Sequence, residues 1–161
     1  DECGGNVSDN EEVVVTASST SSTLYPKCAV DLQDTLSYFH SENQQNGWLM
    51  YDFVDKKIRP TMYAIRSRNY GKGSEHLKNW VIEGSNTSSE NGWKILDIRS
   101  NITSLDDSSA KDVFYIQTKL SDNEYFRYLR LRITGETTNP KIKCYYIKLS
   151  ALEFFGTLQI D

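Results

Sequence analysis

Cysteine and histidine are scarce in this sequence, and their shortage excludes several kinds of site. Of the 161 residues, 3 are cysteine and 2 are histidine. The cysteines show no CxxC spacing, so neither a zinc ribbon nor a thioredoxin-like redox motif is available. No nucleophile elbow and no glycine-rich phosphate loop occurs, and the carboxylates are scattered through polar turns where such groups are ordinarily solvated. We therefore expect a protein that is not an enzyme.

Long apolar runs and an excess of positive charge are missing as well. No stretch approaches the length of a membrane span or of the apolar part of a signal peptide. Lys and Arg number 18 against 22 Asp and Glu, which gives a net charge of -4. Such a chain as a whole is not attracted to phosphate backbones or anionic lipid, so we expect no nucleic-acid partner and no membrane span. The length fits one domain over residues 1–161, with residues 1–10 poorly ordered.

Short segments rich in β-branched and aromatic residues, separated by polar turns, make up most of the chain. Residues 13–17 are the first of them. Residues 128–134 alternate most clearly, with Leu129, Leu131 and Ile133 on one face and arginines on the other. Further strands are predicted at residues 48–53, 57–67, 113–118, 146–149 and 152–155. No helix with a regular apolar stripe is evident, so the sequence predicts an all-β fold, an antiparallel β-sandwich of about eight strands with helix limited to single turns.

The hairpin predicted over residues 79–97 is the stretch around which the other strands are arranged. Trp80 lies in an extended segment, and a polar Ser/Asn/Gly run then turns the chain toward Trp93. A buried indole ring removes a large apolar area from water. We therefore expect Trp80 and Trp93, with Trp48 at the start of another strand, to be core residues that act only through stability. A second hairpin is predicted over residues 48–67.

The order of these segments resembles the coagulation-factor type C, or discoidin, family. The tryptophan hairpin of residues 79–97 carries the resemblance, and residues 48–67, 126–131 and 152–156 look like the family's early strand pair and its last two strands. The similarity covers residues 3–158 and is closest to the non-secreted branch found in protist proteins and beside BTB or ankyrin modules. It implies a galactose-binding-like β-sandwich, or jelly roll, with long loops at one end and a binding role without catalysis.

Cysteine usage bears on the cellular compartment. Secreted discoidin domains commonly join a cysteine near the start to one after the last strand, but here Gly156 is followed by Thr157. We therefore expect Cys3, Cys28 and Cys144 to be free thiols, and a cytoplasmic rather than a secreted location. N-glycosylation sequons favour the opposite location, at residues 6–8, 86–88 and 101–103.

Polar loops of unusual length are expected to meet at one end of the sandwich, and loops on a rigid scaffold commonly carry binding. The longest covers residues 18–47, and residues 68–74 and 141–146 are its expected neighbours. Residues 39–41 and 68–71 resemble the segments with which galactose-binding relatives hold sugar hydroxyls. The candidate ligand-binding residues are His40, Arg68, Asn69, Tyr145 and Tyr146.

The chemistry of these residue types suits a hydroxyl-rich ligand. Histidine and arginine offer directional donors, and a tyrosine ring can stack on the apolar face of a sugar. For each residue taken alone the alternative is structural: His40 caps a turn, Arg68 is solvated, and one of the two tyrosines belongs to the core.

Acidic residues in the long loop also suggest a metal. Asp31, Asp34 and Thr35, with Glu153 late in the chain, resemble the calcium ligands of carbohydrate-binding modules that share this fold, and such oxygen ligands suit a hard cation. The glycine usual after the first aspartate is missing. The alternative is that these side chains cap backbone amides without a metal.

Two functions remain open at this point. The first is a non-catalytic domain that binds a protein or peptide partner through its loop end, as the resemblance implies. The alternative is lectin-like binding of a galactose-type carbohydrate through His40 and Arg68, with calcium as a structural ion. A glycoside-processing enzyme would need two facing carboxylates, and nothing in the sequence places such a pair.

Overall fold

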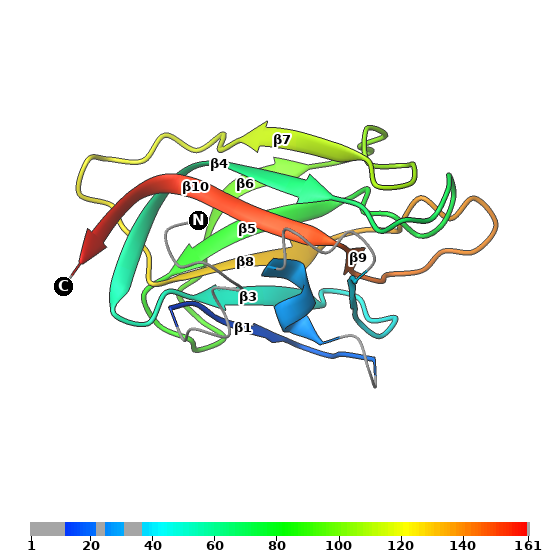
Figure 1. Ribbon diagram of the computed structural model, residues 1–161. Helices are drawn as coiled ribbons and strands as arrows, with labels where there is room; N and C mark the ends of the chain where they lie inside the picture. The colour runs from blue at the N-terminus through cyan, green and yellow to red at the C-terminus, as the bar shows by residue number, and fades with distance from the viewer. Residues whose placement is uncertain (1–11, 22–24, 31–36, 161) are drawn as a thin grey trace.

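Strands dominate the computed structural model, which describes residues 12–21, 25–30 and 37–160 (Figure 1). The strands are β1 (Val14–Ala17), β2 (Phe39–His40), β3 (Trp48–Asp52), β4 (Lys56–Arg66), β5 (Trp80–Ser85), β6 (Lys94–Arg99), β7 (Lys111–Tyr115), β8 (Tyr128–Ile133), β9 (Lys148–Leu149) and β10 (Ala151–Ile160). Within the described residues the helix is a single 3-10 segment, η1 (Pro26–Val30), and no helix is long and apolar enough to cross a membrane. The predicted all-β class is confirmed.

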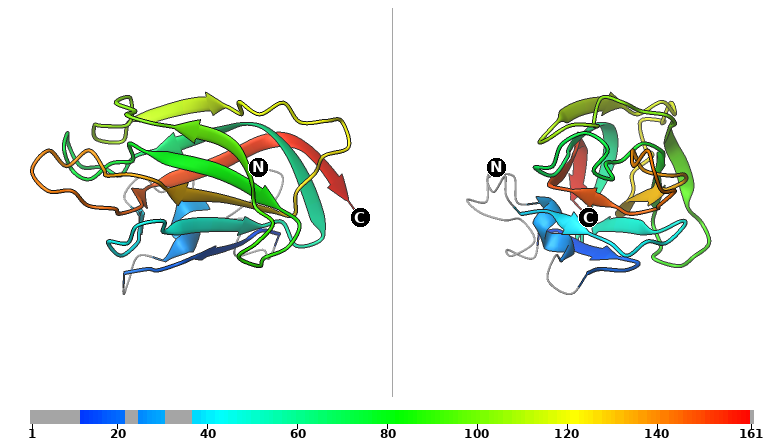
Figure 2. Two further views of the ribbon diagram at one scale, coloured as in Figure 1. Left: turned by 180° about the vertical axis from the view of Figure 1, so that it is seen from behind. Right: turned by 90° about the vertical axis from the view of Figure 1, so that its right-hand side faces the viewer.

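Two antiparallel sheets pack face to face, as the end-on view in Figure 2 shows. The five-stranded sheet has the order β1-β3-β8-β5-β6, and the three-stranded sheet has the order β10-β4-β7. A short ribbon of β2 and β9 joins them at one end of the molecule. The predicted antiparallel β-sandwich is therefore confirmed, and β2 and β9 account for the strands beyond the expected eight.

β8 lies at the centre of the larger sheet, and its two faces differ as the alternation in the sequence predicts. Leu129, Leu131 and Ile133 are fully buried in the core, whereas Arg130 and Arg132 lie on the outer face. β8 pairs with β3 on one edge and with β5 on the other. Its apolar face is covered by the second sheet, and its arginines stay on the uncovered outer face.

The predicted hairpin of residues 79–97 is present as β5 and β6. Trp80 pairs with Arg99, and a bulge lies between Ile82 and Glu83. Every residue of β5 is buried, and Trp80 is fully enclosed between the sheets. The hairpin thus supplies the centre of the core.

The other two tryptophans lie outside the core, so the expectation for them is wrong. Trp48 is half-buried on the outer face of β3, opposite Arg132 of β8. Trp93 is also half-buried, and the Arg130 guanidinium lies 4.0 Å from the centroid of its ring. Side chains alternate between the two faces of a strand, and in β3 the inward position belongs to Leu49, so Trp48 points outward. Trp93 lies on the outer face because the arginines there provide a cationic partner for its ring.

The predicted hairpin of residues 48–67 is wrong as well. β3 pairs with β1 and β8, whereas β4 pairs with β10 and β7, so the chain crosses from one sheet to the other between them. Phe53 and Ile58 flank this corner and are both buried, which closes the end of the core there. Two strands that are joined by a short turn show the same alternation whether they pair as a hairpin or enter different sheets, so the sequence pattern does not distinguish the two arrangements.

β10 continues beyond the predicted end of the last strand. It runs through Gly156 to Ile160 beside β4, with a bulge between Phe155 and Gly156. A Cβ atom at Gly156 would lie 2.1 Å from the Arg59 carbonyl oxygen, so only glycine allows the two strands to approach here.

A buried polar chain links the two sheets through Tyr63 of β4. The Tyr63 hydroxyl donates to Asp97 Oδ2 at 2.5 Å and accepts from Trp80 Nε1 at 2.9 Å. Arg99 Nε donates to the same carboxylate at 2.9 Å. Burial, and then the bond to Asp97, raise the pKa of Tyr63 far above its usual value, so the hydroxyl remains a donor at every physiological pH.

Cys144 carries a free thiol, as predicted, and is buried with its Sγ 3.0 Å from Thr137 Oγ1. For Cys28 in η1, and for Cys3, which lies outside the described residues, the free thiol stays a prediction. The expected poor order of residues 1–10 also concerns residues that the structure does not describe.

Candidate functional site

Three loops meet at the end of the sandwich that lies at the right of Figure 1. They precede β3, follow β4 and precede β9, in agreement with the predicted grouping of residues 18–47, 68–74 and 141–146. Aromatic rings and cations from these loops and from β9 contact one another. We call this group the loop-end cluster; it consists of Tyr38, His40, Arg68, Tyr70, Tyr146 and Lys148.

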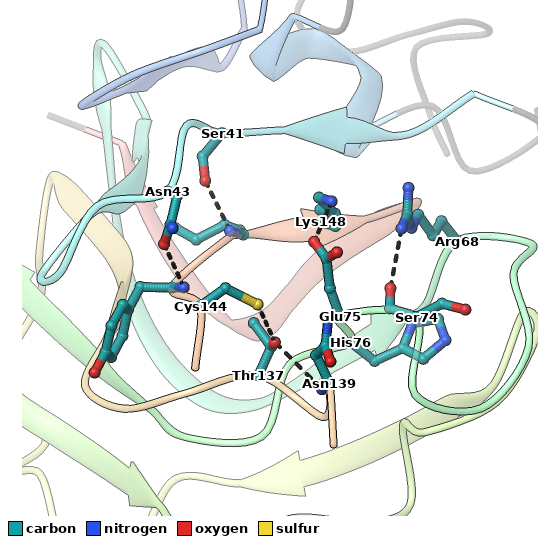
Figure 3. Close-up of polar contacts among 12 residues, drawn as sticks. Ser41, Asn43, Arg68, Ser74, Glu75, His76, Thr137, Asn139, Cys144 and Lys148 are labelled. Atoms are coloured by element: carbon teal, nitrogen blue, oxygen red, sulfur yellow. Dashed lines mark hydrogen bonds and ion pairs between the residues drawn. The ribbon is translucent and has the colours of Figure 1, made fainter. Parts of the chain in front are cut away.

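Arg68 follows the end of β4 and is 8% exposed. Its guanidinium carbon lies 4.0 Å from the centroid of Tyr70 and 5.1 Å from that of Tyr38. Nη2 donates to the Ser74 carbonyl at 3.0 Å, as Figure 3 shows, while Nε has no hydrogen-bond partner. Tyrosine rings favour a cation through their electron-rich faces, so they hold the charge of Arg68 in place without a carboxylate among the described residues.

His40 lies in β2, opposite Lys148 of β9. Its ring stacks on Tyr38 with centroids 6.2 Å apart and meets Tyr146 edge-on at 5.5 Å. Burial first, and then the charges of Lys148 and Arg68, lower the pKa of His40 below its usual value. The imidazole is therefore neutral at pH 7, with one donor and one acceptor nitrogen, and neither nitrogen has a hydrogen bond to the described residues.

Lys148 is nearly buried, at 6% exposure, although it is a lysine within a strand. Its Nζ lies 4.0 Å from the centroid of Tyr146 and forms an ion pair with Glu75 (Figure 3). Glu75 has a backbone φ of 63°, a left-handed conformation that residues other than glycine adopt at a cost in free energy. The ion pair thus ties the loop after β4 to the ribbon that carries His40.

His76 holds the same loop from inside and is fully buried. Its Nε2 lies 2.9 Å from the Tyr70 carbonyl oxygen and 3.0 Å from that of Gly71. Carbonyl oxygens can only accept, so Nε2 carries the hydrogen and donates to both. The loop is fixed on its other side by Gly73 N, which donates to Asp106 Oδ1 at 2.8 Å. Tyr70, 48% exposed, is therefore presented by a rigid turn.

The structure brings three of the predicted ligand-binding residues together and leaves two apart. His40, Arg68 and Tyr146 belong to the loop-end cluster. Asn69 is exposed and accepts a hydrogen bond from Ser108 Oγ. Tyr145 is partly buried and packs against the core, in line with the structural alternative for one of the two tyrosines, and it also lines a separate cavity. A role in binding stays a prediction for all five residues.

Sequence reasoning missed the other members of the cluster and their supports. Tyr70 stands two residues after Arg68 within the candidate binding segment of residues 68–71, so its closeness to Arg68 in the sequence is a usable signal. Lys148 follows Ile147 in an apolar segment, where a lysine is unusual. Nothing in the sequence marks Glu75 or His76, because their positions depend on how the loop folds back on itself.

The predicted calcium ligands are described only in part. Asp31, Asp34 and Thr35 lie outside the described residues. Glu153 lies in β10 opposite Ala64, on the outer face of the three-stranded sheet, since its neighbour Leu152 is in the core. Within the described part of the chain no group of three His, Cys, Asp or Glu side chains could hold a metal. The calcium site stays a prediction.

The cluster has the chemistry of a binding surface for hydroxyl groups. It combines donors on His40 and Arg68 with the partly exposed rings of Tyr70 and Tyr146. Its adjoining carboxylate, Glu75, is already ion-paired, so no pair of facing carboxylates stands among these described residues.

Comparison with known proteins identifies the fold. No protein-family model matches the sequence, and no curated protein matches it. CBM32-3, from a family 31 glycoside hydrolase of Clostridium perfringens, is similar with a TM-score of 0.69 and 16% identity over 92% of this chain and 94% of that one. The family 32 CBM of C. perfringens NanJ, solved in complex with galactose, has a TM-score of 0.66 and 10% identity over 92% and 95% of the two chains.

A fucolectin from striped bass (Morone saxatilis) serum is similar as well. Its TM-score is 0.68 at 20% identity, and the alignment covers 94% of this chain but 48% of the fucolectin. The chain spans about half the length of that lectin. At these identities the likeness shows the fold alone: this chain shares the antiparallel β-sandwich architecture of these modules and of the lectin.

Proposed function

We propose that this chain is a carbohydrate-binding module without catalytic activity, and that the loop-end cluster holds the sugar. The observation that carries the proposal is the state of His40 and Arg68. Both stand beside tyrosine rings, and both have ring or guanidinium nitrogens without a hydrogen-bond partner among the described residues. Polar groups held in this way, on a rigid loop, lose little freedom when a ligand binds.

Each member of the cluster has a distinct part in binding. The Arg68 guanidinium donates to sugar hydroxyls, and the neutral His40 ring donates from one nitrogen and accepts at the other. The partly exposed ring of Tyr70 or Tyr146 covers the apolar face of the sugar. Lys148, paired with Glu75, positions Tyr146 rather than touching the ligand.

The known structures support carbohydrate as the ligand class more than a protein partner. One structural neighbour was solved with galactose and another is a fucolectin, although the low identities carry the fold and not the ligand. Binding of a protein partner through the loop end stays a prediction that no specific contact in the structure favours. The narrower resemblance to the non-secreted discoidin branch likewise has no structural support beyond the shared fold.

A glycan array followed by titration with galactose tests the proposal. We expect Arg68→Ala to weaken sugar binding by about 10- to 100-fold, as hydrogen bonds from a charged donor are worth roughly 1.5–3 kcal/mol. His40→Ala should weaken it as well. Arg127→Ala is a matched control, because Arg127 pairs with Asp52 just before β8, away from the cluster. Sugar binding that survives both cluster substitutions would contradict the proposal, and so would an array without any bound glycan.

A further inference from the structure

A cavity of about 220 Å³ is lined by Tyr145, the residue before Tyr146 of the loop-end cluster. Its lining comes from three places in the chain: the loop before β3, the loop after β8 and the segment before β9. The lining residues are Gln45, Asn46, Thr134, Gly135, Glu136 and Tyr145. None of them belongs to the loop-end cluster.

The walls of this cavity are fixed by hydrogen bonds. Tyr145 N donates to Asn43 Oδ1 at 2.7 Å, which holds the backbone that carries the ring. Arg132 Nη1 donates to Asn46 Oδ1 at 3.0 Å, and Asn46 itself has a φ of 59°. On the opposite side Asn79 Nδ2 donates to the Glu136 carbonyl at 2.9 Å. The cavity is therefore formed before any ligand arrives.

The polar groups that face this cavity have few partners of their own. Among the described residues, the side chains of Gln45, Thr134 and Tyr145 take part in no hydrogen bond. The carboxylate of Glu136 has Lys78 Nζ at 4.0 Å, too far for a hydrogen bond, and both side chains are partly exposed. Donors, acceptors and an aromatic ring thus converge on one space without satisfying one another.

Size and charge narrow the ligand. The volume corresponds to roughly seven water molecules at about 30 Å³ each, below the usual range for drug-sized ligands, so it suits one sugar ring rather than a peptide. Glu136 disfavours acidic sugars but accepts hydrogen bonds from hydroxyls. A hard cation would find only this one carboxylate, next to a lysine.

We propose that this cavity is a second subsite, which holds one neutral pyranose unit through the Tyr145 ring, the amides of Gln45 and Asn46, and the Glu136 carboxylate. The site stands on residues of its own, although the choice of a sugar as ligand rests on the proposed function. Two subsites at one end let the module engage two sugar units, and each then raises the local concentration of the other.

Nuclear magnetic resonance on the whole chain tests the subsite directly. Galactose, glucose, mannose and N-acetylglucosamine are each titrated to millimolar concentrations, and the side-chain amide signals of Gln45 and Asn46 are followed. We expect at least one of these sugars to shift both signals in the wild type. The shifts should persist in Arg68→Ala, since that substitution disables only the loop-end cluster.

Adjacent tyrosines provide the matched pair of variants. Tyr145→Leu should abolish the shifts, whereas Tyr146→Leu should leave them, because Tyr145 lines this cavity and Tyr146 contacts His40 in the loop-end cluster. Glu136→Gln should weaken the sugar by about tenfold, since a charged acceptor is lost. The Glu136 side chain is partly exposed, so Glu136→Gln should fold normally and still tests the subsite if Tyr145→Leu fails to fold.

The possible outcomes separate the two proposals. If none of the sugars shifts the Gln45 and Asn46 signals while galactose shifts those of the loop-end cluster, the second subsite is wrong and the proposed function stands. Shifts that disappear in Arg68→Ala report on the cluster alone and also overturn the subsite. Shifts at Gln45 and Asn46 with none at the cluster would instead support the subsite and count against the cluster as the sugar site.

Discussion

Arg68 and Lys148 are unusual among the cations of this chain because both are buried at less than one-tenth exposure beside tyrosine rings. A cation over such a ring is stabilised by roughly 0.5–2 kcal/mol, more when water is excluded. Together with burial, which is the larger cause, their charges lower the pKa of His40 and favour its neutral ring. At the scale of single residues, the cluster is therefore an electrostatic unit and not a set of independent side chains.

Titration of His40 follows from this coupling. Because the pKa is lowered in the folded state, the unfolded chain binds the proton more readily, so this residue's contribution to stability is lost as the pH falls below about 6.5. We expect Arg68→Ala to move the pKa of His40 up toward its usual value, since a nearby positive charge is removed. The pKa is measured by following the imidazole proton signals of His40 in nuclear magnetic resonance spectra as the pH is changed, with Arg127→Ala as control. Equal pKa values in the wild type, Arg68→Ala and Arg127→Ala would contradict an effect of the Arg68 charge on His40.

Tyr63 provides a second prediction at this scale. Tyr63→Phe leaves the buried Trp80 indole N–H without a partner and removes one of the two hydrogen bonds to Asp97 Oδ2, which should lower the free energy of unfolding by about 1–3 kcal/mol. Tyr115→Phe is the control: that side chain is 71% exposed in β7, and its loss should cost almost nothing. Chemical denaturation compares the two. Equal stability of both variants would refute a structural role for the buried hydroxyl.

At the scale of strands, the sequence predicted elements better than it predicted their partners. The alternation in residues 128–134 determines one apolar face, and the structure places that face in the core. The segment of residues 48–67 has equally clear strands, but whether a short connection makes a hairpin or a corner depends on which sheet receives the second strand. That choice rests on contacts with β7 and β10, distant in sequence.

The two tryptophans of the β5–β6 hairpin make this point testable. Trp80→Ala should cost about 3–5 kcal/mol of unfolding free energy as a core cavity. Trp93→Ala should cost about 1–2 kcal/mol, since it loses a cation–π contact with Arg130 near the surface and an exposed hydrogen bond from the indole to the Ser89 carbonyl. Denaturant titrations with equal slopes measure both. Similar losses would mean that Trp93 contributes to the core after all.

The candidate site could be predicted only for the residues that the resemblance or their position in the sequence supplied. The resemblance supplies His40 and Arg68, the position just before the last strand supplies Tyr146 as one of two candidate tyrosines, and the structure places these three residues together. Residues such as His76 could not be found in this way, because that side chain acts on carbonyls of its own loop. Contacts of this kind depend on loop conformation, which no periodicity in the sequence specifies.

At the scale of the whole molecule, the predicted calcium remains to be tested. If Asp31, Asp34, Thr35 and Glu153 share an ion, its binding to the folded chain alone stabilises the protein. We then expect excess chelator to lower the melting temperature and added calcium to restore it. Glu153→Gln should weaken that response. A melting curve indifferent to chelator and to calcium would reject the site.

The cytoplasmic location expected from the cysteines also stays a prediction.

The course of β10 has a practical consequence. The strand begins two residues after β9, which carries Lys148, and runs to the opposite end of the sandwich (Figure 1). At about 3.3 Å per residue its ten residues span roughly 30 Å. A biotin attached beyond Ile160 would therefore anchor the protein to a streptavidin-coated sensor chip with the loop-end cluster and the cavity beside Tyr145 turned toward the analyte. Attachment through surface lysines would offer no such control, since the partly exposed Lys78 lies beside Glu136 in the lining of that cavity.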